Sequence, residues 1–291
     1  MSNIAVVIPS IRPLMIEPFS EAWRPLFDYH KVEVVVVEDG DTPFVLHKGT
    51  TYTPQEIMGD YTDIIFNKND GIRNLGFAFV KKRLPDTQYI FTTDDDCFPV
   101  GDTLADHLAQ LGKMVPISWL STTSEYTRGF PYEIRKEALV VLSHGVWEGI
   151  KDYDAPTQLI KGNPETEFYK GQIPKGVYFP MCIMNVMFDT ELLPFMYQFP
   201  MGPRVGVDRF ADIWSGIVAK REMDKRNWAA VSGYARILHK KASNVFVNLQ
   251  KEALGISLNE GFWKGDENHE YFKLYHEKRK RWEEFICDIA S

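Results

Sequence analysis

The sequence predicts an α/β protein in which a mostly parallel sheet is flanked by helices. In the first hundred residues, short runs of apolar and β-branched residues alternate with segments whose apolar residues recur at helical spacing. Strands separated by helical segments of this length are typical of βαβ units, which build open parallel sheets. With 44% hydrophobic residues among 291, the chain is also long enough to bury one large core.

The expected elements alternate along the first half of the chain. Residues 32–37 include four consecutive valines, and such a β-branched run is expected of a strand covered on both faces. The expected strands are residues 4–8, 32–37, 63–66 and 89–93. The expected helices are marked by Phe19, Trp23, Leu26 and Phe27, and then by Ile72, Leu75, Phe79 and Val80.

The second half is less regular and richer in aromatic residues and proline. A turn-rich stretch at 151–175 precedes an apolar run at 178–188 and a helix-like segment at 208–220. A charged helical tail follows at 269–289, and its aromatic face is expected to pack across the body. No change in composition marks a linker, so the sequence predicts one domain with a helical extension.

Charge and cysteine content disfavour several classes of protein. The formal net charge is −7, which argues against nonspecific nucleic-acid binding because that binding relies on Lys and Arg. No apolar stretch approaches the roughly 20 residues of a membrane-spanning helix, and the amino terminus lacks the pattern of a secretory signal. The three cysteines are too far apart for a disulfide framework or a zinc knuckle. A cytoplasmic location is therefore expected.

Polar clusters follow three of the expected strands. They occupy residues 9–12, residues 38–41 and the triple aspartate at 94–96. The carboxyl ends of parallel strands meet at one edge of a sheet, where ligands bind. Adjacent carboxylates there suit a hard divalent cation that also binds substrate phosphates. A solvated turn is the alternative, because a motif of this length also occurs without function.

Two common nucleotide motifs are absent from the sequence. There is no GxxxxGK followed by Ser or Thr, and no GxGxxG follows the first expected strand. These absences disfavour a nucleoside triphosphatase and a nicotinamide or flavin site. Metal-assisted handling of a sugar nucleotide is the natural chemistry left for an acidic strand end.

Longer strings in the sequence resemble one known family. They are VEDGD at 37–41, FTTDDDCF at 91–98, RGFP at 128–131, SHGVW at 143–147, DYDAPTQ at 152–158 and KASN at 241–244. In this order, and across almost the whole chain, they resemble the reversibly glycosylated polypeptide family, the UDP-arabinopyranose mutases.

The resemblance implies a glycosyltransferase-A-like fold and a metal-dependent reaction. A single nucleotide-sugar-binding catalytic domain is expected over residues 1–262, with a helical tail over 263–291 packed on it. The implied activity interconverts UDP-L-arabinopyranose and UDP-L-arabinofuranose with a divalent metal, Mn²⁺ or Mg²⁺. The expected partners are the UDP-sugar and UDP, and no nucleic acid. The sequence leaves a homo-oligomer open.

Metal ligands follow from the same resemblance. Asp96 is expected to bind the metal directly with Asp94 beside it, and Asp94 or Asp95 is expected to face the ribose. His239, just before KASN, is the expected second protein ligand, because a neutral imidazole suits Mn²⁺. Without the resemblance, a histidine that caps a loop is the favoured interpretation of His239.

Two arginines carry the expected chemistry at the sugar. Arg128 and Arg135 lie seven residues apart, so that both could face one pocket, and Arg128 corresponds to the family's reversibly glycosylated arginine. A guanidinium is a poor nucleophile because it stays protonated. A bidentate clamp on the diphosphate is the alternative for both side chains. The resemblance favours the nucleophile for Arg128 only.

The remaining candidates handle protons and the nucleotide. Asp152 and Asp154 are expected to transfer protons to ring hydroxyls, with a turn-stabilising role as the alternative. Asp212 keeps one of the two adjacent aspartates that the family has before Met-Trp. Asp39 is expected to accept a hydrogen bond from the uracil N3–H. The positions expected to bind the nucleotide are Ser10, Arg12, Asp39, Asp41, Arg73, Asp94 and Asp95.

Two other functions compete with the mutase. A glycosyltransferase would pass the sugar from UDP to an external acceptor, and a binding protein would keep the fold without turnover. Most catalytic candidates are present, which disfavours the binding protein.

Overall fold

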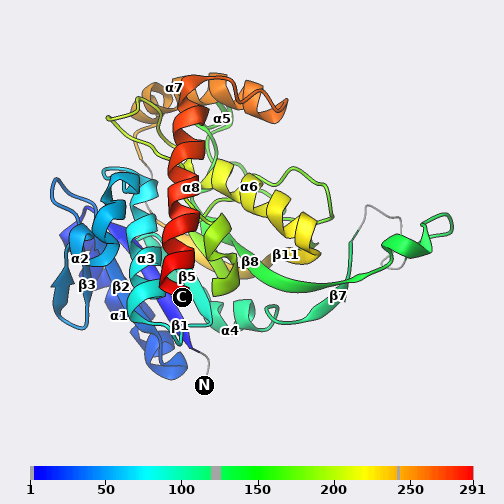
Figure 1. Cartoon of the computed structure of the whole chain (residues 1–291), viewed down its shortest axis with the longest axis horizontal. Helices are drawn as coiled ribbons and strands as arrows, with labels where there is room; N and C mark the ends of the chain where they lie inside the picture. The colour runs from blue at the N-terminus through cyan, green and yellow to red at the C-terminus, as the bar shows by residue number, and fades with distance from the viewer. Residues whose placement is uncertain (1–2, 119–125, 241–242, 291) are drawn as a thin grey trace.

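The computed structural model describes residues 3–118, 126–240 and 243–290, in which helices pack on a central sheet (Figure 1). In five of the six central strands the chain runs in the same direction, and β10 runs against them. The prediction of a mostly parallel α/β sheet flanked by helices is confirmed. The central order is β2 (Glu33–Glu38), β1 (Ile4–Ser10), β5 (Tyr89–Thr93), β10 (Asn185–Asp189), β8 (Glu137–Gly149) and β11 (Trp228–His239).

Shorter antiparallel strands extend this sheet. Beyond β2 lie β3 (Phe44–His47) and β4 (Thr50–Tyr52), while β7 (Met114–Pro116) pairs with β8 and β9 (Gly171–Gln172) pairs with β11. The strand β6 (Cys97–Pro99) begins directly after the triple aspartate and runs antiparallel to the end of β11. Because Cys97 pairs with His239 in this register, the triple aspartate and His239 lie side by side.

Residues 63–66 do not form the expected strand. The 3-10 helix η1 (Gly59–Ile64) ends within them, although Ile64, Ile65 and Phe66 are all buried. The neighbour of β2 is instead β3, which was not predicted. A short apolar run predicts burial, but its periodicity does not separate a strand from a helical turn. This prediction was therefore wrong.

The helices cover both faces of the sheet. On one face, α1 (Pro13–His30) and α4 (Thr103–Leu108) pack against Ile4, Val6 and Ile8 of β1. On the other face, α3 (Arg73–Arg83), α6 (Ala211–Arg226) and α8 (Glu270–Ala290) enclose a core that contains Ala5 and Val7. Alternate residues of β1 thus face opposite cores, as expected for a strand buried on both sides.

The remaining helices are shorter or lie beside the sheet. They are α2 (Pro54–Met58), α5 (Ala155–Lys161), α7 (Val245–Trp263), η2 (Asp70–Ile72), η3 (Tyr132–Ile134) and η4 (Thr190–Phe195). The helices α5 and α7 pack on each other at one end of the molecule (Figure 1). Over the described ranges, no helix combines the length and apolar character required to cross a bilayer.

The carboxyl-terminal helix α8 packs by its aromatic face, as the sequence predicts. Tyr271, Tyr275 and Trp282 are buried, and the Tyr275 ring stacks on Phe199 with 3.4 Å between centroids. The Trp282 indole N–H donates to the Leu193 carbonyl at 2.9 Å. These side chains share one core with α3 and α6. The division into residues 1–262 and 263–291 stays a prediction.

Candidate functional site

A large cavity lies at the carboxyl ends of β1, β2, β5 and β11. Its volume is about 900 Å³, which is sufficient for a nucleotide sugar. Its lining combines residues that follow strands with residues from the second half of the chain. The predicted site residues that line it are Ser10, Arg12, Asp39, Arg73, Asp94, Asp95, Asp96, Asp152, Asp154, Asp212 and His239.

Asp95 is held in place by residues that follow β1. The Ser10 hydroxyl donates to Asp95 Oδ2 at 2.5 Å, and the Arg12 Nε–H donates to the same oxygen at 3.2 Å. Arg12 Nη2 also contacts Asp95 Oδ1 and donates to Asp96 Oδ2 at 3.0 Å. Since Asp95 is only 1% exposed and both its oxygens are occupied, it orders the site rather than offering free oxygens to a ligand.

Arg73 holds Asp94 in the same way. The side chain is buried at the start of α3, contacts Asp94 through Nη2, and donates from Nε to the Thr92 hydroxyl at 3.2 Å. Burial lowers the pKa of Arg73, but the charges of Asp94, Asp70 and Asp212 more than offset this effect. Burial raises the pKa of Asp94 although Arg73 opposes it. Arg73 is therefore committed to aspartates and is not free to bind phosphate.

Asp96 and His239 are placed as two ligands of one cation would be. The His239 Nδ1 lies 2.8 Å from the Ile150 carbonyl, so Nδ1 carries a proton and Nε2 is the ring nitrogen left for a cation. Nε2 lies 3.9 Å from Asp96 Oδ1. Two ligands of one ion lie about 3 to 4 Å apart when each is about 2.1 Å from it. The described residues contain no group of three or more such ligands in metal-site geometry, so water or phosphate oxygens would complete the coordination.

The excess of acidic side chains around the cavity also favours a bound cation. Among the described residues, ten Asp and Glu side chains line the cavity, against four Arg and Lys side chains. A nucleoside diphosphate would be repelled by this excess of negative charge, because Coulomb repulsion is strong in a partly buried cleft. A divalent cation between the aspartates and the diphosphate would remove the repulsion. The donor chemistry and the charge therefore both fit the metal that the sequence predicts.

Asp39 and Asp41 differ although both follow β2. Asp39 lines the cavity and accepts from the Lys68 backbone N–H at 2.5 Å, and burial raises its pKa to about 7. Asp41 is exposed, pairs with Lys68 and does not line the cavity. The structure therefore brings only Asp39 to the site.

Asp212 lies in the first turn of α6 and is buried. Its Oδ2 accepts from the Ile183 backbone N–H at 3.1 Å. Burial, together with the charges of Asp70 and Asp152, raises the pKa of Asp212 to about 7. Such a carboxyl group can both accept and donate a proton near neutral pH.

The two aspartates of the DYDAPTQ string have different environments. Asp154 is the N-cap of α5, since its side chain accepts from the Thr157 backbone N–H at 2.9 Å and from the Thr157 hydroxyl at 2.8 Å. The turn-stabilising alternative is thus observed for Asp154. Asp152 lines the cavity and contributes to the raised pKa of Asp212.

Arg128 and Arg135 lie outside the cavity. The described residues 126–136 lead into β8 and extend away from the helices (Figure 1). Arg128 is exposed, and Arg135 donates to the Phe130 carbonyl at 2.8 Å and stacks on Tyr132. The expectation that both arginines face one pocket is not met in this structure, because the segment that carries them folds on itself.

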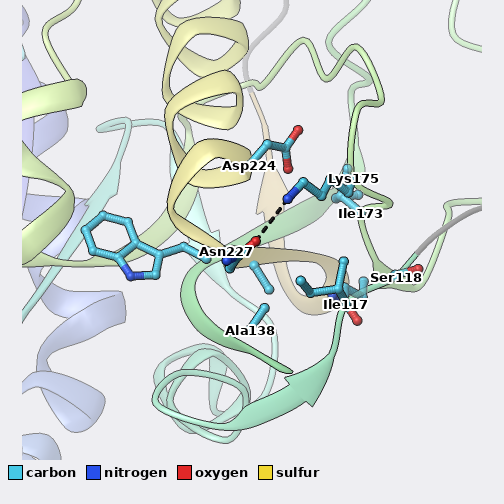
Figure 2. A pocket seen from close by; sticks show the side chains of 10 residues that line it. Ile117, Ser118, Ala138, Ile173, Lys175, Asp224 and Asn227 are labelled. Atoms are coloured by element: carbon cyan, nitrogen blue, oxygen red, sulfur yellow. Dashed lines mark hydrogen bonds between the residues drawn. The ribbon is translucent and has the colours of Figure 1, made fainter. Parts of the chain in front are cut away.

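A much smaller pocket lies at the base of this segment, where Lys175 Nζ donates to Asn227 Oδ1 at 2.9 Å (Figure 2). Its volume is about 10 Å³, room for no more than one water molecule. Ile117 and Ala138 form its apolar side. The pocket joins α6, β8 and the segment after β7, and it is too small for a substrate.

Several cavity residues were missed by the sequence prediction. Arg209 lies two residues before the start of α6, and α7 contributes Glu252, Asn259 and Glu260. Polar residues at helical spacing within an apolar helix were the available signal for α7. No sequence signal marked Arg209. Lys241 and Ala242 of the KASN string lie outside the described residues.

Comparisons with known proteins agree with the sequence resemblance. A family model described as "Reversibly glycosylated polypeptide" matches residues 1–265. "UDP-arabinopyranose mutase 3" of Arabidopsis thaliana is 36% identical over 288 residues, which cover 90% of this chain and 75% of that protein. "UDP-arabinopyranose mutase 1" of Oryza sativa subsp. japonica is 35% identical over 291 residues, covering 91% and 76%.

A similar solved structure is the catalytic domain of Drosophila beta1,4galactosyltransferase 7 in complex with xylobiose. It covers 85% of this chain and 79% of its own, with 11% identity and a TM-score of 0.41. This score is too low to carry an argument. The sequence matches are sufficient by themselves, and the chain belongs to the reversibly glycosylated polypeptide family.

Proposed function

We propose that this protein interconverts UDP-L-arabinopyranose and UDP-L-arabinofuranose with the help of a divalent metal. The anomeric C–O bond to UDP would break, the sugar ring would open and close through a different hydroxyl, and the bond to UDP would form again. The observation that carries the proposal is the cavity itself. In a chain 36% identical to a UDP-arabinopyranose mutase, ordered aspartates and His239 share this cavity with the buried Asp212.

The nucleotide would bind beside the strand ends. Asp39 would accept the hydrogen bond of the uracil N3–H in its ionised form. Asp94 would face the ribose with the oxygen that Arg73 does not contact, because Ser10 and Arg12 occupy both oxygens of Asp95. Asp96 and His239 would hold Mn²⁺ or Mg²⁺. When bound, the metal would stabilise negative charge on the departing diphosphate.

The sugar would face the carboxylates of the second half. Opening and closing the ring moves a proton between ring oxygens, and Asp212 and Asp152 are the acids that line the cavity for this task. A carboxyl group with a pKa of about 7 suits this role, because it gives up and takes back a proton at little cost near neutral pH. Asp154 would have a structural role, as the N-cap of α5.

The sugar has to be held while it is detached from UDP. A covalent intermediate on Arg128 would require residues 126–136 to reach the cavity, and it would also require a base to deprotonate the guanidinium. An ion pair between the detached sugar and UDP would require neither, provided that the hydroxyl of the new ring bonds to the anomeric carbon before the bond to the original ring oxygen breaks, with the proton passing from the attacking oxygen to the departing one. Water must be excluded in both cases, because it would otherwise hydrolyse the activated sugar.

The proposal is tested by incubating the protein with UDP-arabinopyranose and Mn²⁺ and separating the products by chromatography. The expected product is UDP-arabinofuranose, and its formation should stop when EDTA removes the metal. Release of UDP only in the presence of an added acceptor would point to a glycosyltransferase instead. Binding without turnover would contradict both enzymes.

A further inference from the structure

We propose that Arg209 positions the sugar of the bound nucleotide sugar by donating hydrogen bonds to its hydroxyl oxygens. This inference rests on the proposed function and adds a residue that lies outside every string carrying the family resemblance. Arg209 lies two residues before the start of α6, on the wall of the large cavity.

The guanidinium of Arg209 has N–H donors that are not used by other described residues. Within the described ranges it donates no hydrogen bond, and its one ion pair, from Nε to Glu252 Oε1, is 3.9 Å long. The other arginines of the cavity differ, because Arg12 is occupied by Asp95 and Asp96, and Arg73 by Asp94. A guanidinium has five N–H donors in a fixed fork, and Arg209 lines a cavity that is large enough for the substrate.

The backbone of Arg209 is held in an unfavourable conformation. Its φ is +71°, in the left-handed region where a residue with a Cβ is strained. Both neighbours in the chain are anchored. Asp208 accepts from the Arg209 N–H at 2.9 Å and pairs with Lys251, and the Phe210 ring lies 5.1 Å from that of Trp214. Strain of this kind persists where the surroundings enforce it, and it is concentrated at functional sites.

The charges around Arg209 favour a sugar over a phosphate. Asp70, Asp152 and Glu252 all raise its pKa, although burial acts in the opposite direction. The same carboxylates would repel a phosphate group. A sugar hydroxyl donates one hydrogen bond and accepts others, so it can bind a guanidinium and a carboxylate at once. The cluster of one arginine among several carboxylates therefore fits a neutral, polyhydroxyl ligand.

The test compares the affinity for UDP with the affinity for UDP-arabinopyranose, measured by calorimetry with Mn²⁺ present. In Arg209→Gly, the Kd for UDP should stay within about twofold of wild type, while the Kd for the UDP-sugar should rise at least about tenfold. Arg209→Lys should lie between, because an ammonium donates hydrogen bonds without the planar fork. Added methylguanidinium should restore part of the lost affinity of Arg209→Gly.

Lys31→Gly is the matched control. Lys31 also has a left-handed backbone, with a φ of +54°, but it ends α1 and does not line the cavity. Lys31→Gly should raise the melting temperature by relieving strain, and only Arg209→Gly should change sugar binding. If Arg209 had only a structural role, Arg209→Gly would change the affinities for UDP and for the UDP-sugar equally.

Each other outcome is decisive. An equal loss of affinity for UDP and UDP-sugar in Arg209→Gly would make Arg209 a diphosphate clamp and overturn the proposal, as would no loss for either. If the wild type binds both nucleotides but forms no furanose, the proposed function fails while the comparison still decides the role of Arg209. A wild type that binds no UDP-sugar overturns both.

Discussion

The hydrogen bond from His239 to the Ile150 carbonyl is expected of both roles that the sequence leaves open for this histidine. A histidine that only capped a loop would need one ring nitrogen for that bond. Here the other nitrogen is directed at Asp96, 3.9 Å away, inside a cavity rich in carboxylates. A carbonyl that fixes the tautomer of a metal-binding histidine is the usual arrangement at protein metal sites.

We expect His239→Ala to weaken Mn²⁺ binding at least about tenfold, because the loss of one protein ligand removes a bond that water replaces poorly. A Mn²⁺ titration of the UDP complex, followed by electron paramagnetic resonance, measures this. His276→Ala is the control, because His276 is exposed and pairs with Glu267 on the surface. An unchanged titration in His239→Ala would remove His239 from the ligands.

Asp212 shows how a buried carboxyl group costs stability. Its pKa in the folded state is about 7, against an ordinary value of 3.8, so the folded chain holds this proton more tightly than the unfolded chain. Stability therefore falls as the pH rises from about 4 to about 7, and above that range the buried charge is destabilising.

Asp212→Asn should raise the free energy of unfolding on the order of 1 to 3 kcal/mol near pH 8, with little effect near pH 4, and it should abolish turnover. Urea denaturation at both pH values provides the measurement. Asp154→Asn is the control, because asparagine also caps a helix and should change stability by less than about 0.5 kcal/mol. If Asp212→Asn had the same effect at both pH values, the buried charge would not be its cause.

At the scale of elements, α7 connects the cavity to the rest of the fold. One face supplies Glu252 and Asn259 to the cavity, and Gly255 allows Phe210 to approach closely. A Cβ at Gly255 would lie 2.3 Å from Phe210 Cδ2, well inside van der Waals contact. The position of α7 therefore depends on a glycine next to the segment that carries Arg209.

Gly255→Ala should destabilise the protein by about 1 to 3 kcal/mol through overpacking, and it should raise the KM for the UDP-sugar by moving the cavity wall. Thermal unfolding and steady-state kinetics test the two effects. In the same helix, a Cβ at Gly261 meets nothing closer than 3.4 Å, so Gly261→Ala should leave both quantities nearly unchanged. Equal effects of the two substitutions would exclude the contact with Phe210 as the cause.

At the scale of the whole molecule, α8 completes the core on one face of the sheet. It brings buried aromatic rings against η4 and α6, and Trp282 is fully buried, with its indole N–H bonded to the Leu193 carbonyl. Removal of these side chains would expose a core that includes residues of β1 and α3. The stability of the cavity-bearing sheet thus depends on the end of the chain.

Trp282→Ala should cost about 3 to 5 kcal/mol of unfolding free energy, the usual loss for a large buried aromatic residue. Denaturant unfolding followed by circular dichroism measures it. Trp263→Ala is the matched control, because Trp263 is 58% exposed at the end of α7 and should cost much less. A small loss in Trp282→Ala would show that α8 contributes little to the core.

Much of the framework was predictable because it depends on local pattern. The valine-rich strand, the buried residues Phe19, Trp23 and Phe27 of α1 and the aromatic tail all follow from the spacing of apolar residues. The meeting of Ser10, Arg12, Asp39 and the triple aspartate at one edge follows from the rule that parallel strands end together. Family membership was also evident from strings spread over the chain.

Tertiary contacts decided what local pattern could not. Residues 63–66 are buried but do not join the sheet. The side chains of Arg12 and Arg73 form ion pairs with aspartates. The segment that carries Arg128 and Arg135 lies away from the cavity, while α7 and Arg209 line it. The physical reason is that the spacing of apolar residues specifies only which face of a helix or strand is apolar. Which other element packs on that face is specified by contacts between segments far apart in the sequence.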